Sequence, residues 1–133
     1  MVVVPDDQES IRKSEIEGKV MPWFLNQLNQ YDEEERNAIK VCAIEFVNDG
    51  KISSPSVEIE KNTLYNQQRI MELCSAFVLM DKDRSDCAKF AKIVFATTFY
   101  NTESSTLEKK IKGRDKMQIS LDSYWEAVLK KKY

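Results

Sequence analysis

Apolar side chains recur three or four positions apart along most of the chain, which is the period of an amphipathic α-helix. Three stretches between residues 20 and 80 show this pattern, and each places its apolar side chains on one helical face. In chain order the expected faces are Met21, Phe24, Leu25 and Leu28; Ile39, Cys42, Ala43, Phe46 and Val47; and Leu64, Ile70, Leu73, Cys74, Phe77 and Val78. The pattern therefore predicts three helices here, the last of them ending near Met80.

Polar residues, glycine and proline indicate where these helices begin and end. Pro22 suits the first turn of the first helix, where a missing backbone N–H costs nothing. Asp32 can accept a backbone hydrogen bond at the start of the second helix, with Glu35 able to reach back. Gly50 is expected to end that helix, because glycine tolerates a left-handed conformation. The alternation over residues 57–60 could form a brief strand.

The second half of the chain predicts two more helices, one capped by Asp83 or Ser85 and a final one capped by Asp122. Their apolar faces are Cys87, Phe90, Ala91, Val94, Phe95, Thr98 and Phe99, and then Leu121, Tyr124, Trp125, Val128 and Leu129. Together these elements predict an all-α fold, a compact bundle of five or six helices. Residues 1–18 lack a sustained period and are expected to form a mobile N-terminal arm, which leaves residues 19–133 as a single helical domain.

The amino-acid composition argues against most kinds of catalysis. The chain has no histidine, and so lacks the usual general base and the commonest metal ligand. Its three glycines are isolated, whereas phosphate-binding loops need closely spaced glycines. Its three cysteines fall on apolar faces without a Cys-x-x-Cys pair, which argues against a zinc site or a disulfide framework and indicates buried thiols. We therefore expect no enzymatic activity, no cofactor and no metal.

Charge is unevenly distributed, although the net charge is only −2. Residues 1–60 carry 13 acidic and 6 basic side chains, whereas residues 105–133 carry 4 acidic and 8 basic ones. This division can serve a charged partner, but an ordinary solubilising surface is the favoured explanation. The longest wholly apolar run, Ala76–Met80, is too short for a membrane span or the core of a signal peptide. A cytoplasmic location is expected.

Residues 93–112 join two helical patterns through a polar break, at which Asn101 could supply a tight turn. From Ser104 to Lys112, Leu107 and Ile111 would point inward, while hydroxyl and lysine side chains point outward. This stretch resembles the recognition helix of Fis-type helix-turn-helix proteins. The resemblance implies DNA contact through residues 102–116. The side chains that would face the major groove are Ser104, Ser105 and Glu108, and those that would contact phosphates are Lys109, Lys112, Arg114 and Lys116. Without DNA, the same stretch would be a short amphipathic helix that closes the bundle.

Two functions of different classes therefore remain. The first, which the acidic overall charge places slightly ahead, is a non-enzymatic protein-interaction or regulatory module. It would bind another protein through the acidic first part of the chain or an exposed aromatic patch around Trp23. The second is a small DNA-binding regulator that presents residues 102–116 to the major groove. Neither reading implies a membrane or a small-molecule substrate.

Overall fold

The computed structural model describes the backbone of residues 6–131 and the side chains of residues 15–130. Six α-helices and one 3₁₀ helix form the regular structure of this part, which contains no strand. They are α1 (Asp6–Gln27), α2 (Glu33–Asp49), α3 (Gln67–Ser75), η1 (Ala76–Met80), α4 (Arg84–Val94), α5 (Ser104–Glu108) and α6 (Arg114–Lys131). The predicted all-helical bundle is confirmed.

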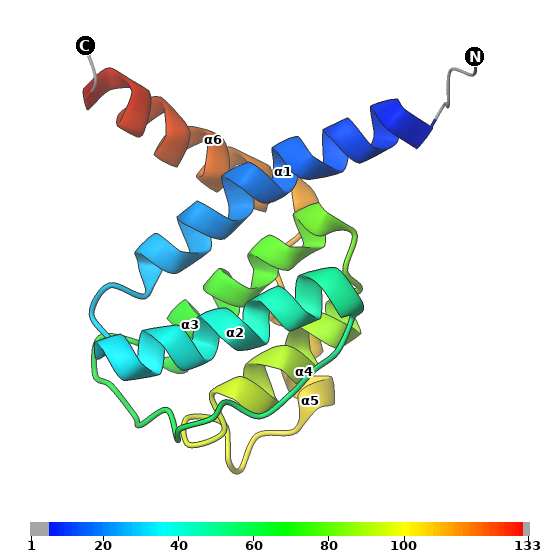
Figure 1. Cartoon of the computed structure of the whole chain (residues 1–133). Helices are drawn as coiled ribbons and strands as arrows, with labels where there is room; N and C mark the ends of the chain where they lie inside the picture. The colour runs from blue at the N-terminus through cyan, green and yellow to red at the C-terminus, as the bar shows by residue number, and fades with distance from the viewer. Residues whose placement is uncertain (1–5, 132–133) are drawn as a thin grey trace.

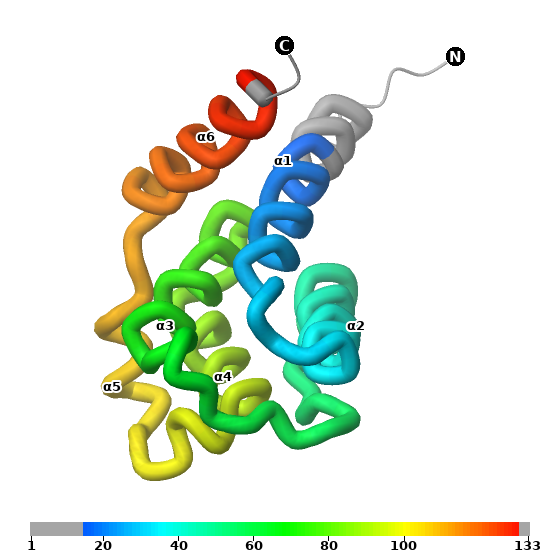
Figure 2. The backbone as a smooth tube through the Cα atoms, turned by 90° about the vertical axis from the view of Figure 1, so that its left-hand side faces the viewer, coloured from blue at the N-terminus to red at the C-terminus, as the bar shows by residue number. Residues whose placement is uncertain are grey.

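The helices pack around the short segment formed by α3 and η1. α1 and α6 both lie against η1 and also contact each other, while α4 packs against α3 and α5. Figure 1 shows α1 crossing the top of the molecule, with α2 and α4 below it. In Figure 2, turned by 90°, α6 lies at the upper left and α2 at the lower right, with α1 between them. α1 and α2 are neighbours in the chain, but their backbones make little contact.

Four phenylalanines from four different elements meet at the centre of the core. Phe77 of η1 lies with its ring centroid 5.0 Å from Phe24 of α1, 5.2 Å from Phe46 of α2 and 5.0 Å from Phe90 of α4. All four rings are almost completely buried. Because aromatic rings bury large areas and prefer offset or edge-to-face contacts, this cluster is the main apolar link between the helices.

A second aromatic contact holds the turn between α1 and α2. The rings of Tyr31 and Tyr65 are stacked with their centroids 4.1 Å apart. The Tyr65 hydroxyl donates to the carbonyl of Gln27 at 2.7 Å and accepts from the N–H of Gln30 at 3.0 Å. One side chain from the long 51–66 connection therefore satisfies the backbone groups that the end of α1 exposes.

Helix ends follow the sequence prediction in some places. Gly50 ends α2 in the left-handed conformation at φ 67°, as expected. Asp83 is the residue before α4, although its side chain makes no capping hydrogen bond. Asp32 also precedes its helix without a capping hydrogen bond from its side chain, and Glu35 does not reach back to it. Instead, the Glu35 carboxylate accepts the backbone N–H of Glu60 at 2.9 Å and ties the long connection to α2.

Four predicted boundaries are wrong. α1 begins at Asp6, so the expected arm over residues 1–18 is helical from that point, and residues 1–5 lie outside the described part. Pro22 therefore stands inside a helix. Asp122 lies within α6, because Met117 is buried and draws the helix start back to Arg114. The third helix begins only at Gln67, after a turn that leaves Leu64 exposed.

The alternation over residues 57–60 forms no strand. It still has a structural use, because Ile59 is buried in the core while Glu58 and Glu60 face solvent. No helix in the described range of residues is both long and apolar enough to cross a membrane.

Candidate functional site

The segment predicted to bind DNA folds differently from a helix-turn-helix. α5 spans only Ser104–Glu108, and residues 95–103 separate it from α4. A helix-turn-helix joins its two helices through a turn of roughly three to four residues, and its second helix must be long enough to lie in the major groove. The inward positions of Leu107 and Ile111 are confirmed, because both are buried. The shape of the segment is thus that of a short helix closing the bundle.

Side chains from other elements fix the connection before α5. The Gln67 amide donates to the carbonyl of Thr98 at 3.0 Å and to the hydroxyl of Thr102 at 3.4 Å. The Lys92 ammonium group donates to the carbonyl of Thr102, and the Thr97 hydroxyl donates to the carbonyl of Ile59. These bonds satisfy the backbone of an irregular segment, so the segment has a definite path over the surface.

The basic side chains of the predicted DNA segment do come together, around the connection between α5 and α6. They line a shallow depression with Arg84 at its edge, and we call this surface the basic basin. Its six cations are Arg84, Lys109, Lys110, Lys112, Arg114 and Lys116, and Asp115 is the acidic side chain in its lining. Ser104, Ser105 and Glu108, the other predicted contacts, lie on α5 outside this lining; Ser105 and Glu108 are exposed and Ser104 is half-buried.

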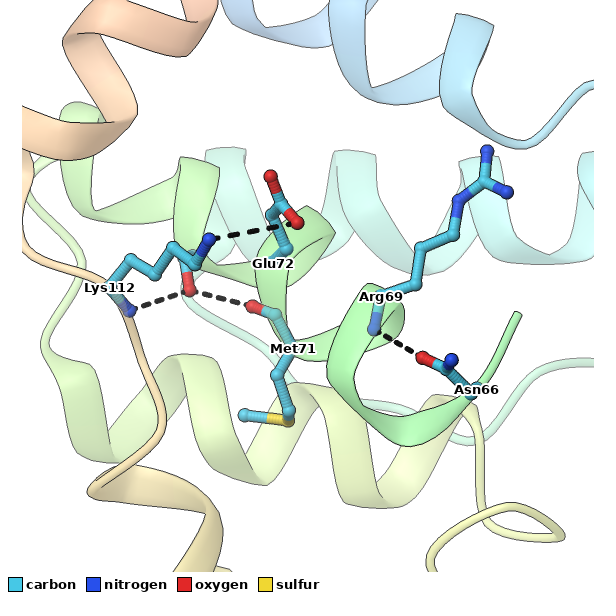
Figure 3. A network of polar contacts seen from close by, with 6 residues as sticks. Asn66, Arg69, Met71, Glu72 and Lys112 are labelled. Atoms are coloured by element: carbon cyan, nitrogen blue, oxygen red, sulfur yellow. Dashed lines mark hydrogen bonds and ion pairs between the residues drawn. The ribbon is translucent and has the colours of Figure 1, made fainter. Parts of the chain in front are cut away.

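The backbone of the basic basin is fixed by a buried hydroxyl. The N–H of Lys112 donates to the Ser75 hydroxyl at 2.9 Å, and that hydroxyl donates to the carbonyl of Met71 at 2.6 Å. Figure 3 shows this chain of contacts running from Lys112 to Met71 in α3, with Glu72 beside it. Ser75 is the buried polar residue among the described side chains. The basin is therefore a fixed part of the fold.

Arginine side chains complete this attachment. Arg84 donates to the carbonyl of Ile111 at 2.5 Å. Arg114 donates to the carbonyl of Val78 at 3.0 Å and forms an ion pair with Asp81 at 2.6 Å. Lys112 lies 3.7 Å from the Glu72 carboxylate, a weak pair at a partly exposed position. Lys109, Lys110 and Lys116, the other three cations of the basin, are exposed and form no hydrogen bond or ion pair through their side chains within the described residues.

Trp23 does not form the exposed aromatic patch that the sequence suggested. Its side chain is only 6% exposed, because it lies on α1 between the fully buried Val20 and Phe24 and packs into the core. Trp125 is half-buried, and its indole N–H donates to the carbonyl of Lys19 at 3.0 Å, which joins α6 to α1. Tyr100 is exposed but isolated, with the Lys61 ammonium over its ring. Trp23 is thus part of the core and of no exposed aromatic patch.

An apolar hollow lies instead between α1 and α2. One part is lined from α1 by Gly18, Met21, Pro22 and Leu25 and from α2 by Lys40 and Ile44. A second part shares Glu17 with the first and is more polar. Its apolar side chains are Ile16 of α1, Val47 of α2, and Leu79 and Met80 of η1, and Asn48, Asp81 and Lys82 line it as well. We call these two adjoining hollows the α1–α2 groove. Val41 and Ile44, three positions apart on α2, are 55% and 41% exposed at its side.

Two residues of α1 that weaken a helix face this groove. Pro22 has no N–H, so the carbonyl of Gly18, four positions earlier, lacks its usual helical partner. Gly18 costs the helix about 0.5–1 kcal/mol relative to alanine. A Cβ atom built at Gly18 would meet nothing within 4 Å, so packing within the molecule does not require glycine there. The groove therefore presents an open surface at Gly18 of α1.

The cysteines offer no reactive centre. All three are buried and unpaired, as the sequence predicted. Burial raises the pKa of the Cys74 and Cys42 thiols, and burial followed by the charges of Asp86 and Asp83 raises the pKa of Cys87 to about 12. These thiols stay protonated at neutral pH and are poor nucleophiles. Within the described residues, no group of three His, Cys, Asp or Glu side chains is placed to hold a metal ion.

Comparison of the chain with protein-family models, with curated proteins and with solved structures finds no match in any of the three. Sequence reasoning found the basic basin, because five of its six cations lie within residues 109–116. It missed the α1–α2 groove. The available signal is the pair Gly18 and Pro22, four positions apart, of which the sequence analysis uses only Pro22, as a helix start.

Proposed function

We propose that this protein is a non-enzymatic protein-interaction module, and that it binds an amphipathic helix of a partner protein in the α1–α2 groove. The observation that carries the proposal is the groove itself, which lies between two helices whose backbones make little contact. Its apolar side chains recur at helical spacing on both walls. An amphipathic helix buries its apolar face in such a groove through side chains three or four positions apart.

The size of the groove suits this occupant. Its α1 wall extends from Ile16 to Leu25, which is about 14 Å at a rise of 1.5 Å per residue. That length matches two to three turns of a partner helix. Gly18 lets the partner approach the backbone of α1 closely. The weak helix at Gly18 and Pro22 is then explained by binding.

Substitution of Gly18 tests whether the groove binds a helical peptide. A library of displayed amphipathic helical peptides is selected against the protein, and the dissociation constant of the best binder is measured by isothermal titration calorimetry. We expect Gly18→Leu to weaken this binder at least about tenfold, because the new side chain fills the space that the partner needs. Its unfolding free energy should not fall, since leucine favours a helix more than glycine does.

Matched variants test whether a loss of peptide binding comes from filling the groove or from a change elsewhere in the protein. Gly18→Ala adds the smallest side chain and should weaken the binder less than Gly18→Leu does. Ile44→Glu should weaken it strongly, whereas Ile119→Glu, at an exposed position of α6, should not. Binders that tolerate both Gly18→Leu and Ile44→Glu would reject the proposal. Self-association of the protein that Gly18→Leu abolishes would assign the groove to a second copy of the chain.

DNA binding is a second candidate function, and the cations of the basic basin are the observation that favours it. Phosphate contacts through lysine and arginine give an affinity that falls steeply with salt. A titration with random-sequence duplex DNA at two salt concentrations tests it. This candidate requires binding that weakens with salt and weakens again when Lys109→Ala and Lys112→Ala are combined. Absence of binding in dilute buffer rejects it. Because α5 is one short turn, we expect any such binding to lack sequence preference.

A further inference from the structure

We propose that the basic basin is a binding site for a compact, multiply charged anion, of the class formed by di- and triphosphate groups. The inference goes beyond the interaction function, because it concerns a different surface and does not depend on the α1–α2 groove. It uses part of the surface that the DNA candidate would use, and the two differ in the shape of the ligand. A duplex needs an extended row of cations, whereas a polyphosphate group needs a small cluster.

The cations of the basin form such a cluster. Five of them follow one another within residues 109–116, and Arg84 joins them from α4. Acidic side chains limit the positive surface on its neighbouring sides: Asp81 and Asp83 line the adjoining hollow, and Glu72 lies beside Lys112. Beyond Lys116, the exposed acidic residues Asp122 and Glu126 follow along α6. The positive charge is therefore local and does not continue as a track.

The cations of the cluster are of two kinds, those that contact other parts of the protein and those that extend into solvent. Arg84 and Arg114 tie the backbone of the segment in place, because they donate to the carbonyls of Ile111 and Val78. Lys112 and Arg114 also pair with Glu72 and Asp81. Lys109, Lys110 and Lys116 have exposed positions and extend from this fixed backbone. Like charges held this close repel one another, and a bound polyanion would relieve that repulsion. The backbone is already ordered, so binding pays little for loop ordering.

Burial explains why this arrangement is stable without its ligand. Leu107, Ile111 and Met117 anchor the segment before, within and after the basin, and each is almost fully buried. The buried Ser75 hydroxyl accepts a hydrogen bond from the N–H of Lys112 and donates one to the carbonyl of Met71. A merely solubilising run of lysines needs no such anchoring. A site for an anion does, because its charges must stay in register with the phosphoryl groups.

Isothermal titration calorimetry with inorganic triphosphate in low-salt buffer tests the inference. The test variant combines Lys109→Gln, Lys110→Gln and Lys116→Gln. The control combines Lys19→Gln, Lys51→Gln and Lys89→Gln, which removes the same charge from exposed positions outside the basin. We expect triphosphate to bind the protein more tightly than inorganic phosphate does. The test variant should bind triphosphate about tenfold more weakly, and the control less than about twofold more weakly.

Parallel titrations separate this ligand from other polyanions. A glutamate oligomer of equal charge should bind more weakly than triphosphate, because carboxylates spread the charge over a longer chain. Absence of triphosphate binding, or an equal loss in both triple variants, would overturn the inference. Random-sequence duplex DNA that binds more tightly than triphosphate at physiological salt, and loses that binding in the test variant, would overturn it in favour of DNA. Failure of the groove variants to affect peptide binding would leave these results unchanged.

Discussion

Replacing Phe77 with alanine is expected to destabilise the protein by about 3–5 kcal/mol, the usual loss for truncating a buried phenylalanine. The expectation follows from the position of Phe77, whose ring touches Phe24, Phe46 and Phe90. Truncation would leave a cavity that η1 cannot fill by moving, because α1, α3, α4 and α6 all pack against it. Since single domains are stable by only about 5–15 kcal/mol, much of the total would be lost.

Urea unfolding followed by far-ultraviolet circular dichroism measures this loss. Tyr100→Ala is the matched aromatic control, because Tyr100 is 71% exposed. Its only described ring contact is with the Lys61 ammonium, 5.2 Å from the ring centroid, so we expect a change of less than about 1 kcal/mol. A Phe77→Ala variant as stable as the Tyr100→Ala variant would contradict the four-ring core.

Alkaline solution is expected to unfold the protein more easily, through its buried thiols. Burial raises the pKa of Cys87 to about 12 and the pKa of Cys74 well above its usual value. In the unfolded chain both thiols lose their protons near pH 9.0, the ordinary value. Above that pH the unfolded state therefore binds fewer protons than the folded state, and the free energy of unfolding falls as pH rises. The stabilising effect is complete below about pH 9 and disappears towards about pH 12.

The expected size follows from about 1.4 kcal/mol per pH unit for each thiol once its unfolded form is ionised. Cys87 alone should lower the free energy of unfolding by about 1.4 kcal/mol between about pH 8 and pH 10, and the raised pKa values of Cys74 and Cys42 act in the same direction. Urea titrations under reducing conditions across this range measure it. Cys87→Ala should remove about 1.4 kcal/mol of the dependence, whatever its effect at neutral pH. A flat profile, or an unchanged profile in Cys87→Ala, would show that the thiols ionise freely in the folded protein.

Sequence periodicity predicts the buried faces better than the helix boundaries. Ile39, Cys42 and Phe46 are buried as expected, because a repeating apolar face is a property of several residues at once. A boundary depends on single residues, and tertiary contacts can override them. Pro22 was read as a start signal, but the buried side chains on either side of it keep α1 continuous. Asp122 was read as a cap, but the burial of Met117 extends α6 past it.

The two candidate surfaces differ in the same way. The basic basin is largely visible in the sequence, because residues 109–116 are close together in the chain and therefore in space. The α1–α2 groove depends on two helices standing apart, and no local pattern encodes that separation. Trp23 was expected to be exposed and is buried. A residue beside an apolar face can point outward or inward, and only the packing of α1 against its neighbours decides that it is buried.

The missing hydrogen bond between Pro22 and Gly18 also weakens the backbone of α1 at one point, although the helix continues through it. The ladder of backbone hydrogen bonds is interrupted there, so fraying that starts in the first part of the helix need not propagate into the part that carries Phe24 and Leu28. Thermal fluctuations could then open the beginning of α1 transiently while the centre of the molecule stays folded. A partner that seats itself beside Gly18 would suppress this partial unwinding, and recognition would be accompanied by local rigidification.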